Sequence, residues 1–133
     1  MSDNTLDYLD DIEIYVESND LEAMIQWLSS QLDQFQPRNP GKRGCKFSFV
    51  HNDQRSEGMI VLNAGRTGFT SIWLNSRNTP WHDDVEMGRA AFQALGATVR
   101  CNESAWSKGD DPDRWLQIDR KGEHVIQWVT EEP

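Results

Sequence analysis

An α+β fold, with an antiparallel or mixed sheet and two helices, is what this sequence predicts. Short segments alternate between apolar and polar residues, as half-buried strands do, and two longer segments repeat apolar residues at helical spacing. Turn-forming residues separate these segments. The length of 133 residues suits one domain, so we expect a single domain over residues 1–133, with a frayed acidic N-terminus over residues 1–10.

The first expected strand covers residues 12–17, which alternate between Ile or Val and more polar residues. Asn19 and Glu22 have the spacing of a capping box. An apolar stripe then predicts a helix from about residue 20 to 35. Two prolines follow it, and we expect a basic loop over residues 38–46.

The rest of the chain predicts further strands and a second helix. Asp83 and Glu86 again form a capping box, Trp81 is placed to pack on Val85, and Gly96 ends the helix. Polar connections are expected at residues 51–56 and 103–113. The remaining strands are expected at residues 46–51, 58–64, 69–75, 97–102, 115–118 and 124–129.

The order of elements allows two βαββ-type modules in tandem. The segments IEIYVESND and TSIWLNSRNTPWHDD have similar patterns, and each precedes an expected helix. Over about residues 12–129 this order resembles paired-βαβββ ligand-binding folds such as the vicinal oxygen chelate family, in which two modules curl around a central cavity. No His and Glu match the metal ligands of that family, so the resemblance implies topology only, and we expect no metal and no cofactor.

The charge of the chain is concentrated near its start. Residues 1–37 hold nine of the 22 acidic residues and none of the 13 basic ones, so the remaining 13 acids balance the 13 basic residues. Such a surface attracts a basic protein, and it can equally be a solvated surface that the basic loop at residues 38–46 neutralises. The first hypothesis is a non-enzymatic protein-binding module, such as an inhibitor, an immunity-like protein or an accessory factor. Its expected contacts are Asp10, Asp11, Glu13, Glu17, Glu22, Trp27 and Asp33.

Trp27 lies beside the apolar stripe of the first helix, which fits either the edge of the core or an exposed anchor. The alternative function is a small-molecule-binding protein or enzyme with a pocket between the sheet and the helices. Its expected lining is Tyr15, His51, Trp73, His82, Arg100, Trp115 and Trp128.

Other motifs have simpler explanations. His82 precedes three nearby carboxylates, but nearly consecutive residues do not face one another on a helix, and capping explains them. The loop with Trp106, Asp110 and Asp111 lacks the spacing of a calcium loop. The segment 65–68 lacks the pattern of a phosphate-binding loop and predicts a turn.

Composition narrows the class of partner. A pI near 4.7 disfavours nucleic acid, and no apolar run is long enough to span a membrane. The start lacks the pattern of a secretory signal, and Cys45 and Cys101 form no metal motif, so we expect a cytoplasmic protein with two buried thiols. The expected partner is a basic protein, and a homodimer through an exposed strand edge is a further alternative.

Overall fold

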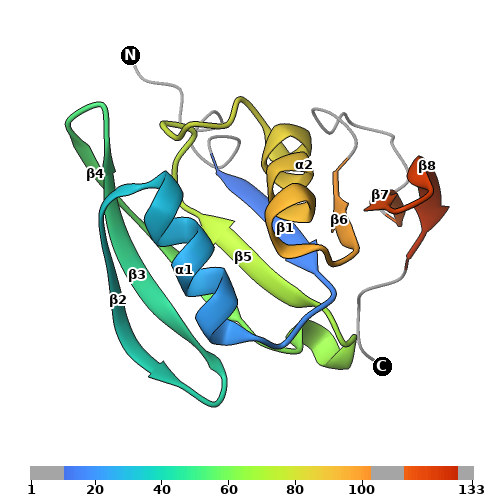
Figure 1. The fold of residues 1–133 in the computed structure, drawn as a ribbon, viewed down its shortest axis with the longest axis horizontal. Coiled ribbons are helices and arrows are strands. Elements are labelled where there is room, and N and C mark those ends of the chain that lie inside the picture. The colour runs from blue at the N-terminus through green and yellow to red at the C-terminus, as the bar shows by residue number, and fades with distance from the viewer. Residues whose placement is uncertain (1–10, 103–112, 129–133) are drawn as a thin grey trace.

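Within the residues that the structure describes, eight strands form one sheet, and the two α-helices lie on the same side of it (Figure 1). The computed structural model describes residues 11–102 and 113–128, and the expected N-terminal segment, most of the loop at 103–113 and Val129 lie outside them. The α+β class is confirmed. The elements are β1 (Ile12–Val16), α1 (Leu21–Gln31), β2 (Asp33–Gly41), β3 (Gly44–His51), β4 (Gln54–Val61), the short helix η2 (Ala64–Arg66), β5 (Thr70–Leu74), α2 (Asp84–Leu95), β6 (Val99–Cys101), β7 (Arg114–Asp119) and β8 (Gly122–Gln127).

The strand order is β2-β3-β4-β5-β1-β6-β7-β8, and every neighbouring pair is antiparallel. The strands β2 to β5 form one meander and β6 to β8 another. The first strand of the chain lies between them, with Ile14 opposite Ile72 of β5 on one side and Cys101 of β6 on the other. Within the described residues, β1 is therefore the strand that joins the two halves of the sheet.

The core lies between the sheet and the two helices. Ile12, Ile14 and Val16 of β1 are 0% exposed, because alternate residues of a strand point to the same face. They share this core with Met24 and Leu28 of α1, and residues of α2 pack beside them. The central strand is thus strictly two-sided, and its odd-numbered residues lie on the face away from the helices.

The segment after α1 differs from the sequence prediction. The helix ends at Gln31, and the expected basic loop is largely β2 and its hairpin with β3. Phe35, which continued the apolar stripe, belongs to β2 and packs on Phe47 with ring centroids 4.9 Å apart. Pro37 and Pro40 are accommodated because β2 is an edge strand, where a missing N–H removes no ladder bond on the open side.

One turn and one helix cap were also placed wrongly from the sequence. Asn52 and Asp53 both have positive φ, as a two-residue hairpin loop requires, so β4 begins at Gln54 and not at residue 58. The cap of α1 is Asp20, whose carboxylate accepts a hydrogen bond from the N–H of Ala23, and not Asn19.

The second helix and the final hairpin are confirmed. The N–H of Glu86 donates to Asp83 Oδ1 (2.9 Å), and the side chain of Glu86 accepts in turn from the N–H of His82 (2.9 Å), the residue before the cap, instead of from Asp83 itself. Gly96 ends α2 in the left-handed conformation, with φ 70°. The strands β7 and β8 pair from Arg114↔Gln127 to Asp119↔Gly122.

The tandem arrangement is present only as an order of elements. With β2 included, each half has the order βαβββ. The strand that follows α1 lies at one edge of the sheet, whereas the strand that follows α2 pairs with β1 in the interior. The two halves therefore do not pair equivalently.

Gly58 of β4 tests the packing of the sheet. A Cβ at this position would overlap the Phe47 ring and the carbonyl oxygen of Trp73, so neither the ring nor the strand can make room freely. We expect Gly58→Ala to lower the free energy of unfolding by about 2–3 kcal/mol, measured by chemical denaturation. Gly41→Ala is the control, because the nearest atom to its Cβ is 3.9 Å away, and it should stay within about 0.5 kcal/mol of wild type. Equal stability of the two variants would contradict the packing.

Candidate binding face

Polar and aromatic side chains gather on the side of the sheet opposite α1 and α2. In the described part of the chain no helix covers this side, which we call the helix-free face. Strand alternation assigns its residues, because they alternate with the buried residues of the core. The helix-free face comprises Asp11, Glu13, Tyr15, Glu17, Phe69, Ser71, Trp73, Arg100, Trp115, Gln117, Asp119, His124, Ile126 and Trp128, and it continues onto β3 and β4.

The carboxylates of Asp11 and Glu13 lie at the centre of this face. Glu13 accepts a hydrogen bond from Ser71 Oγ (2.6 Å) and one from the Tyr15 hydroxyl. Asp11 accepts one from Trp73 Nε1 (2.8 Å). Burial raises the pKa of Glu13 above 4.5 despite these hydrogen bonds, and the charge of Asp11 adds to the effect. Among the described residues, no cation forms an ion pair with either carboxylate.

Tyr15 connects these acids to an aromatic cluster, which we define as Tyr15, Phe69, Trp115 and Trp128. Burial, together with Glu13, raises the pKa of Tyr15 to about 12, so its hydroxyl stays a donor at neutral pH. Its ring makes edge-to-face contacts with Trp115 (5.5 Å) and Trp128 (5.3 Å). The Trp115 indole N–H is buried and has no hydrogen-bond partner among the described residues.

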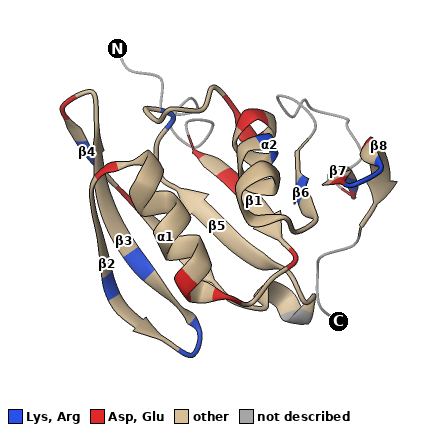
Figure 2. Cartoon of the chain, in the orientation of Figure 1, with Lys and Arg blue, Asp and Glu red and all other residues tan. Residues whose placement is uncertain are grey.

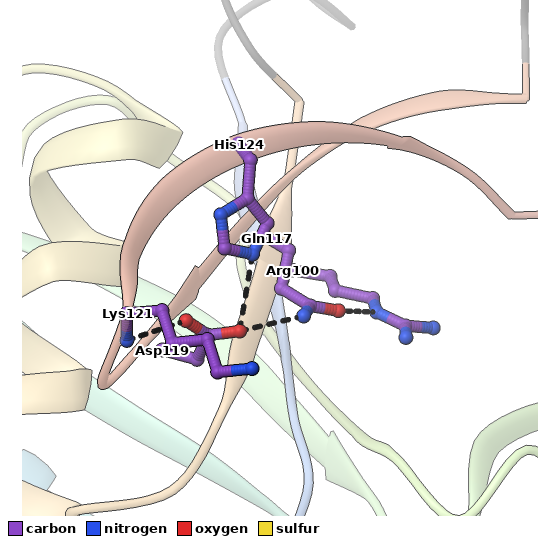
Figure 3. Close-up of polar contacts among 5 residues, drawn as sticks. All are labelled: Arg100, Gln117, Asp119, Lys121 and His124. Atoms are coloured by element: carbon purple, nitrogen blue, oxygen red, sulfur yellow. Dashed lines mark hydrogen bonds and ion pairs between the residues drawn. The ribbon is translucent and has the colours of Figure 1, made fainter.

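Arg100 of β6 lies against this cluster. Its guanidinium carbon is 4.4 Å from the ring centroid of Phe69 and 4.5 Å from that of Trp128. A chain of hydrogen bonds fixes its orientation (Figure 3): Arg100 Nε donates to Gln117 Oε1 (2.8 Å), and Gln117 Nε2 donates to Asp119 Oδ2 (2.8 Å). His124 Nε2 lies 3.1 Å from the same Asp119 oxygen.

A third carboxylate supports β1 from the helix side. At one end of the pairing between β1 and β6, the N–H of Glu17 donates to the carbonyl of Thr98. At the other end the pairing stops at Cys101, opposite Ile14, and does not extend to Glu13. Asp84, in the first turn of α2, accepts a hydrogen bond from the backbone N–H of Glu13 instead. Burial raises the pKa of Asp84 to about 7.

The acidic residues expected to form one docking surface are divided by the structure (Figure 2). Glu22 is exposed in the first turn of α1, whereas Glu13 lies on the helix-free face. Asp33 is exposed at the start of the edge strand β2, where its pairing with Val50 puts it on the helix-free side but with β3, β4 and β5 between it and β1. Trp27 is not an exposed anchor: it is 7% exposed and stacks on Trp81, with ring centroids 5.3 Å apart. Asp10 lies outside the described residues.

The residues expected to line a pocket are better grouped, but on the other side of the sheet. Tyr15, Trp73, Arg100, Trp115 and Trp128 all lie on the helix-free face and not between sheet and helices, because each alternates with a buried core residue or continues that alternation. The two histidines do not join them. His51 ends β3, and His82 is exposed before α2.

Sequence analysis did not identify Phe69, Gln117 and Asp119 as site residues. The signal was present in β7, where Trp115, Gln117 and Asp119 alternate with the core residues Leu116 and Ile118. Trp106, Asp110 and Asp111 lie outside the described residues.

The other motifs have structural roles. His82 and its neighbouring acids form the α2 cap described above, and the described residues hold no group of three or more His, Cys, Asp or Glu that could bind a metal. The segment 65–68 is a turn in which the N–H of Gly68 donates to Asn63 Oδ1 (2.8 Å).

Comparison with protein-family models, curated proteins and solved structures finds no match to this chain. Across residues 11–102 and 113–128, no helix has the length and apolar character needed to cross a membrane.

The raised pKa of Asp84 predicts that the free energy of unfolding depends on pH. Its pKa in the folded protein, about 7, is above the ordinary value of 3.8, so folding is favoured most when the group is protonated in both states. We expect its contribution to be lost as the pH rises from 3.8 towards about 7, by on the order of 4 kcal/mol. Asp84→Asn should remove this part of the slope when the free energy of unfolding is measured against pH. Asp53→Asn removes an exposed carboxylate and should keep the wild-type profile; a slope unchanged by Asp84→Asn would show that the group is ionised at no cost.

Proposed function

We propose that this protein is a non-enzymatic binding module that takes a basic protein partner on its helix-free face, as an inhibitor, an immunity-like protein or an accessory factor would. The observation that carries the proposal is the pair Asp11 and Glu13. Both carboxylates are partly withdrawn from water and hydrogen-bonded, and neither has a cation partner among the described residues.

A cation of the partner would offset the unfavourable desolvation of the ionised carboxylates in the free protein. An ionised carboxylate loses hydration when it is buried, and an opposite charge restores the balance. A Lys or Arg of the partner placed on Glu13 would supply that charge. The formal net charge of −9 also favours the approach of a basic protein over long distances.

The surroundings of these acids suit a protein interface. Trp73 and Tyr15 flank them, and Trp115 and Trp128 continue the same surface. Tyr and Trp are enriched among the residues that dominate binding energy, because they offer a large contact area with few rotatable bonds. We retain the cytoplasm as the proposed compartment, since Cys45 and Cys101 are both buried free thiols.

The division of the acids between two surfaces gives a direct test. The double variant Asp11→Asn/Glu17→Gln neutralises two charges on the helix-free face, and Glu22→Gln/Asp53→Asn neutralises two exposed charges outside it, one on α1 and one in the β3–β4 hairpin loop. Tagged wild type and both variants are used to recover partners from lysate at low and at high salt, with mass spectrometry as the readout. We expect a basic protein that wild type and the second variant recover at low salt and that the first variant loses.

The affinity of the recovered protein is then measured with the purified chains. A loss of about tenfold or more with the helix-free-face variant alone supports the proposal. Equal losses with both variants indicate attraction by net charge only, and loss with the second variant alone places the interface outside the helix-free face. Either of these results contradicts the proposal.

Glu13→Gln separates binding from folding. Because burial raises the pKa of Glu13 above 4.5, the ionised side chain disfavours folding at neutral pH, and the free energy of unfolding of the variant should be unchanged or up to about 1 kcal/mol higher. Partner binding should be weakened, because Gln offers no charge. In wild type the affinity should rise as the pH is raised through the pKa of Glu13, since a cation binds the ionised form. A flat pH profile in wild type, or a variant that binds normally, would remove Glu13 from the interface.

A further inference from the structure

The helix-free face also holds the guanidinium of Arg100, whose two Nη atoms have no acceptor among the described residues. Arg100 Nε is occupied by Gln117, but no described residue accepts a hydrogen bond from its two Nη atoms, which point away from Gln117 (Figure 3). No carboxylate of the described residues forms an ion pair with it. Burial lowers the pKa of Arg100, and the charge of Glu17 opposes that change.

The guanidinium is held in place without its charge being neutralised. Phe69 and Trp128 stack on it, and Gln117 is itself oriented by Asp119. The backbone N–H of Lys121 donates to the other oxygen of Asp119 (2.9 Å), which fixes the far end of this chain. A rigid guanidinium loses less conformational entropy on binding, and its fork matches the two oxygens of a carboxylate.

We propose that Arg100, with the rings of Phe69 and Trp128, forms a binding site for a carboxylate that is attached to an apolar group. This goes beyond binding of a basic partner, which requires cations on Asp11 and Glu13. The carboxylate belongs either to a free organic acid or to an Asp or Glu side chain of the partner.

Two features favour a carboxylate over a phosphate. Arg100 is a single cation, Glu17 is near enough for its charge to act on it, and the chain is strongly acidic, so a dianion is repelled more than a monoanion. The aromatic cluster beside it offers apolar contact for the body of an acid.

The test follows the arginine side-chain N–H signals by NMR in the full chain. The probes are phenylacetate, benzylammonium, inorganic phosphate and a short peptide with blocked ends and one Glu. We expect phenylacetate or the peptide to shift the Arg100 signals with a dissociation constant of about 1 mM, and benzylammonium to leave them in place. Binding of phenylacetate supports a free acid, and binding of the peptide alone supports a side chain of the partner.

Matched variants test whether binding depends on Arg100 itself or only on the loss of one positive charge. With binding followed by the indole N–H signal of Trp128, which every variant keeps, Arg100→Gln should weaken binding by about tenfold or more, whereas Lys46→Gln on β3, an equal loss of charge, should leave it unchanged. Glu17→Gln should strengthen binding about threefold, because it removes a competing carboxylate. If Arg100→Gln does not fold, Arg100→Lys keeps the charge but loses the fork, and it should weaken binding. Unshifted Arg100 signals with both carboxylates, a stronger response to phosphate, or equal binding by the Arg100 and Lys46 variants would overturn the proposal.

Discussion

The rest of the structure depends on the insertion of β1 between β5 and β6. Ile12, Ile14 and Val16 belong to the core that the sheet shares with both α-helices, and the same strand joins two meanders that have no other pairing between them in the described residues. Because residues of a strand alternate between faces, the burial of these three side chains also dictates where Glu13 and Tyr15 must lie. A change of register by one residue would place an acid in the core, so folding and presentation of the binding face depend on one pairing.

The polar groups around β1 reinforce that register. Asp84 accepts the N–H of Glu13 at the point where β6 no longer pairs with β1, and Ser71 holds the side chain of the same residue on the opposite face. Both contacts place carboxylates in partly buried surroundings, which disfavours their ionised forms. A fold selected for stability alone has better choices at these positions, because an amide can accept the same hydrogen bonds without a charge.

Local patterns predicted most of the elements but not the long-range arrangement. Alternation and caps located β1, α2 and the β7–β8 hairpin correctly, since their signals lie within a few residues. The strand β2 was missed because Leu32 and Phe35 happen to continue the helical spacing, whereas the stacking of Phe35 on Phe47 depends on a partner twelve residues away. For the same reason the aromatic residues of the site could be named from the sequence, but their face could not. That choice depends on the pairing of β1 with β5 and β6, which no local window contains.

The helix-free face carries charges of both signs, and in the described residues Glu13 and Arg100 form no ion pair. Glu13 is held by Ser71 and Tyr15 on the β5 side, and Arg100 is turned towards Gln117 on the β7 side. Tyr15 and Arg100 are directly opposite each other in the ladder of β1 and β6. The Tyr15 ring packs on Trp115 and Trp128, and Trp128 also lies against the guanidinium of Arg100. Each group has its own hydrogen-bond partners, Ser71 for Glu13 and Gln117 for Arg100. The face therefore keeps a negative and a positive site in fixed positions, which is the arrangement that recognition of a partner with a defined charge pattern requires.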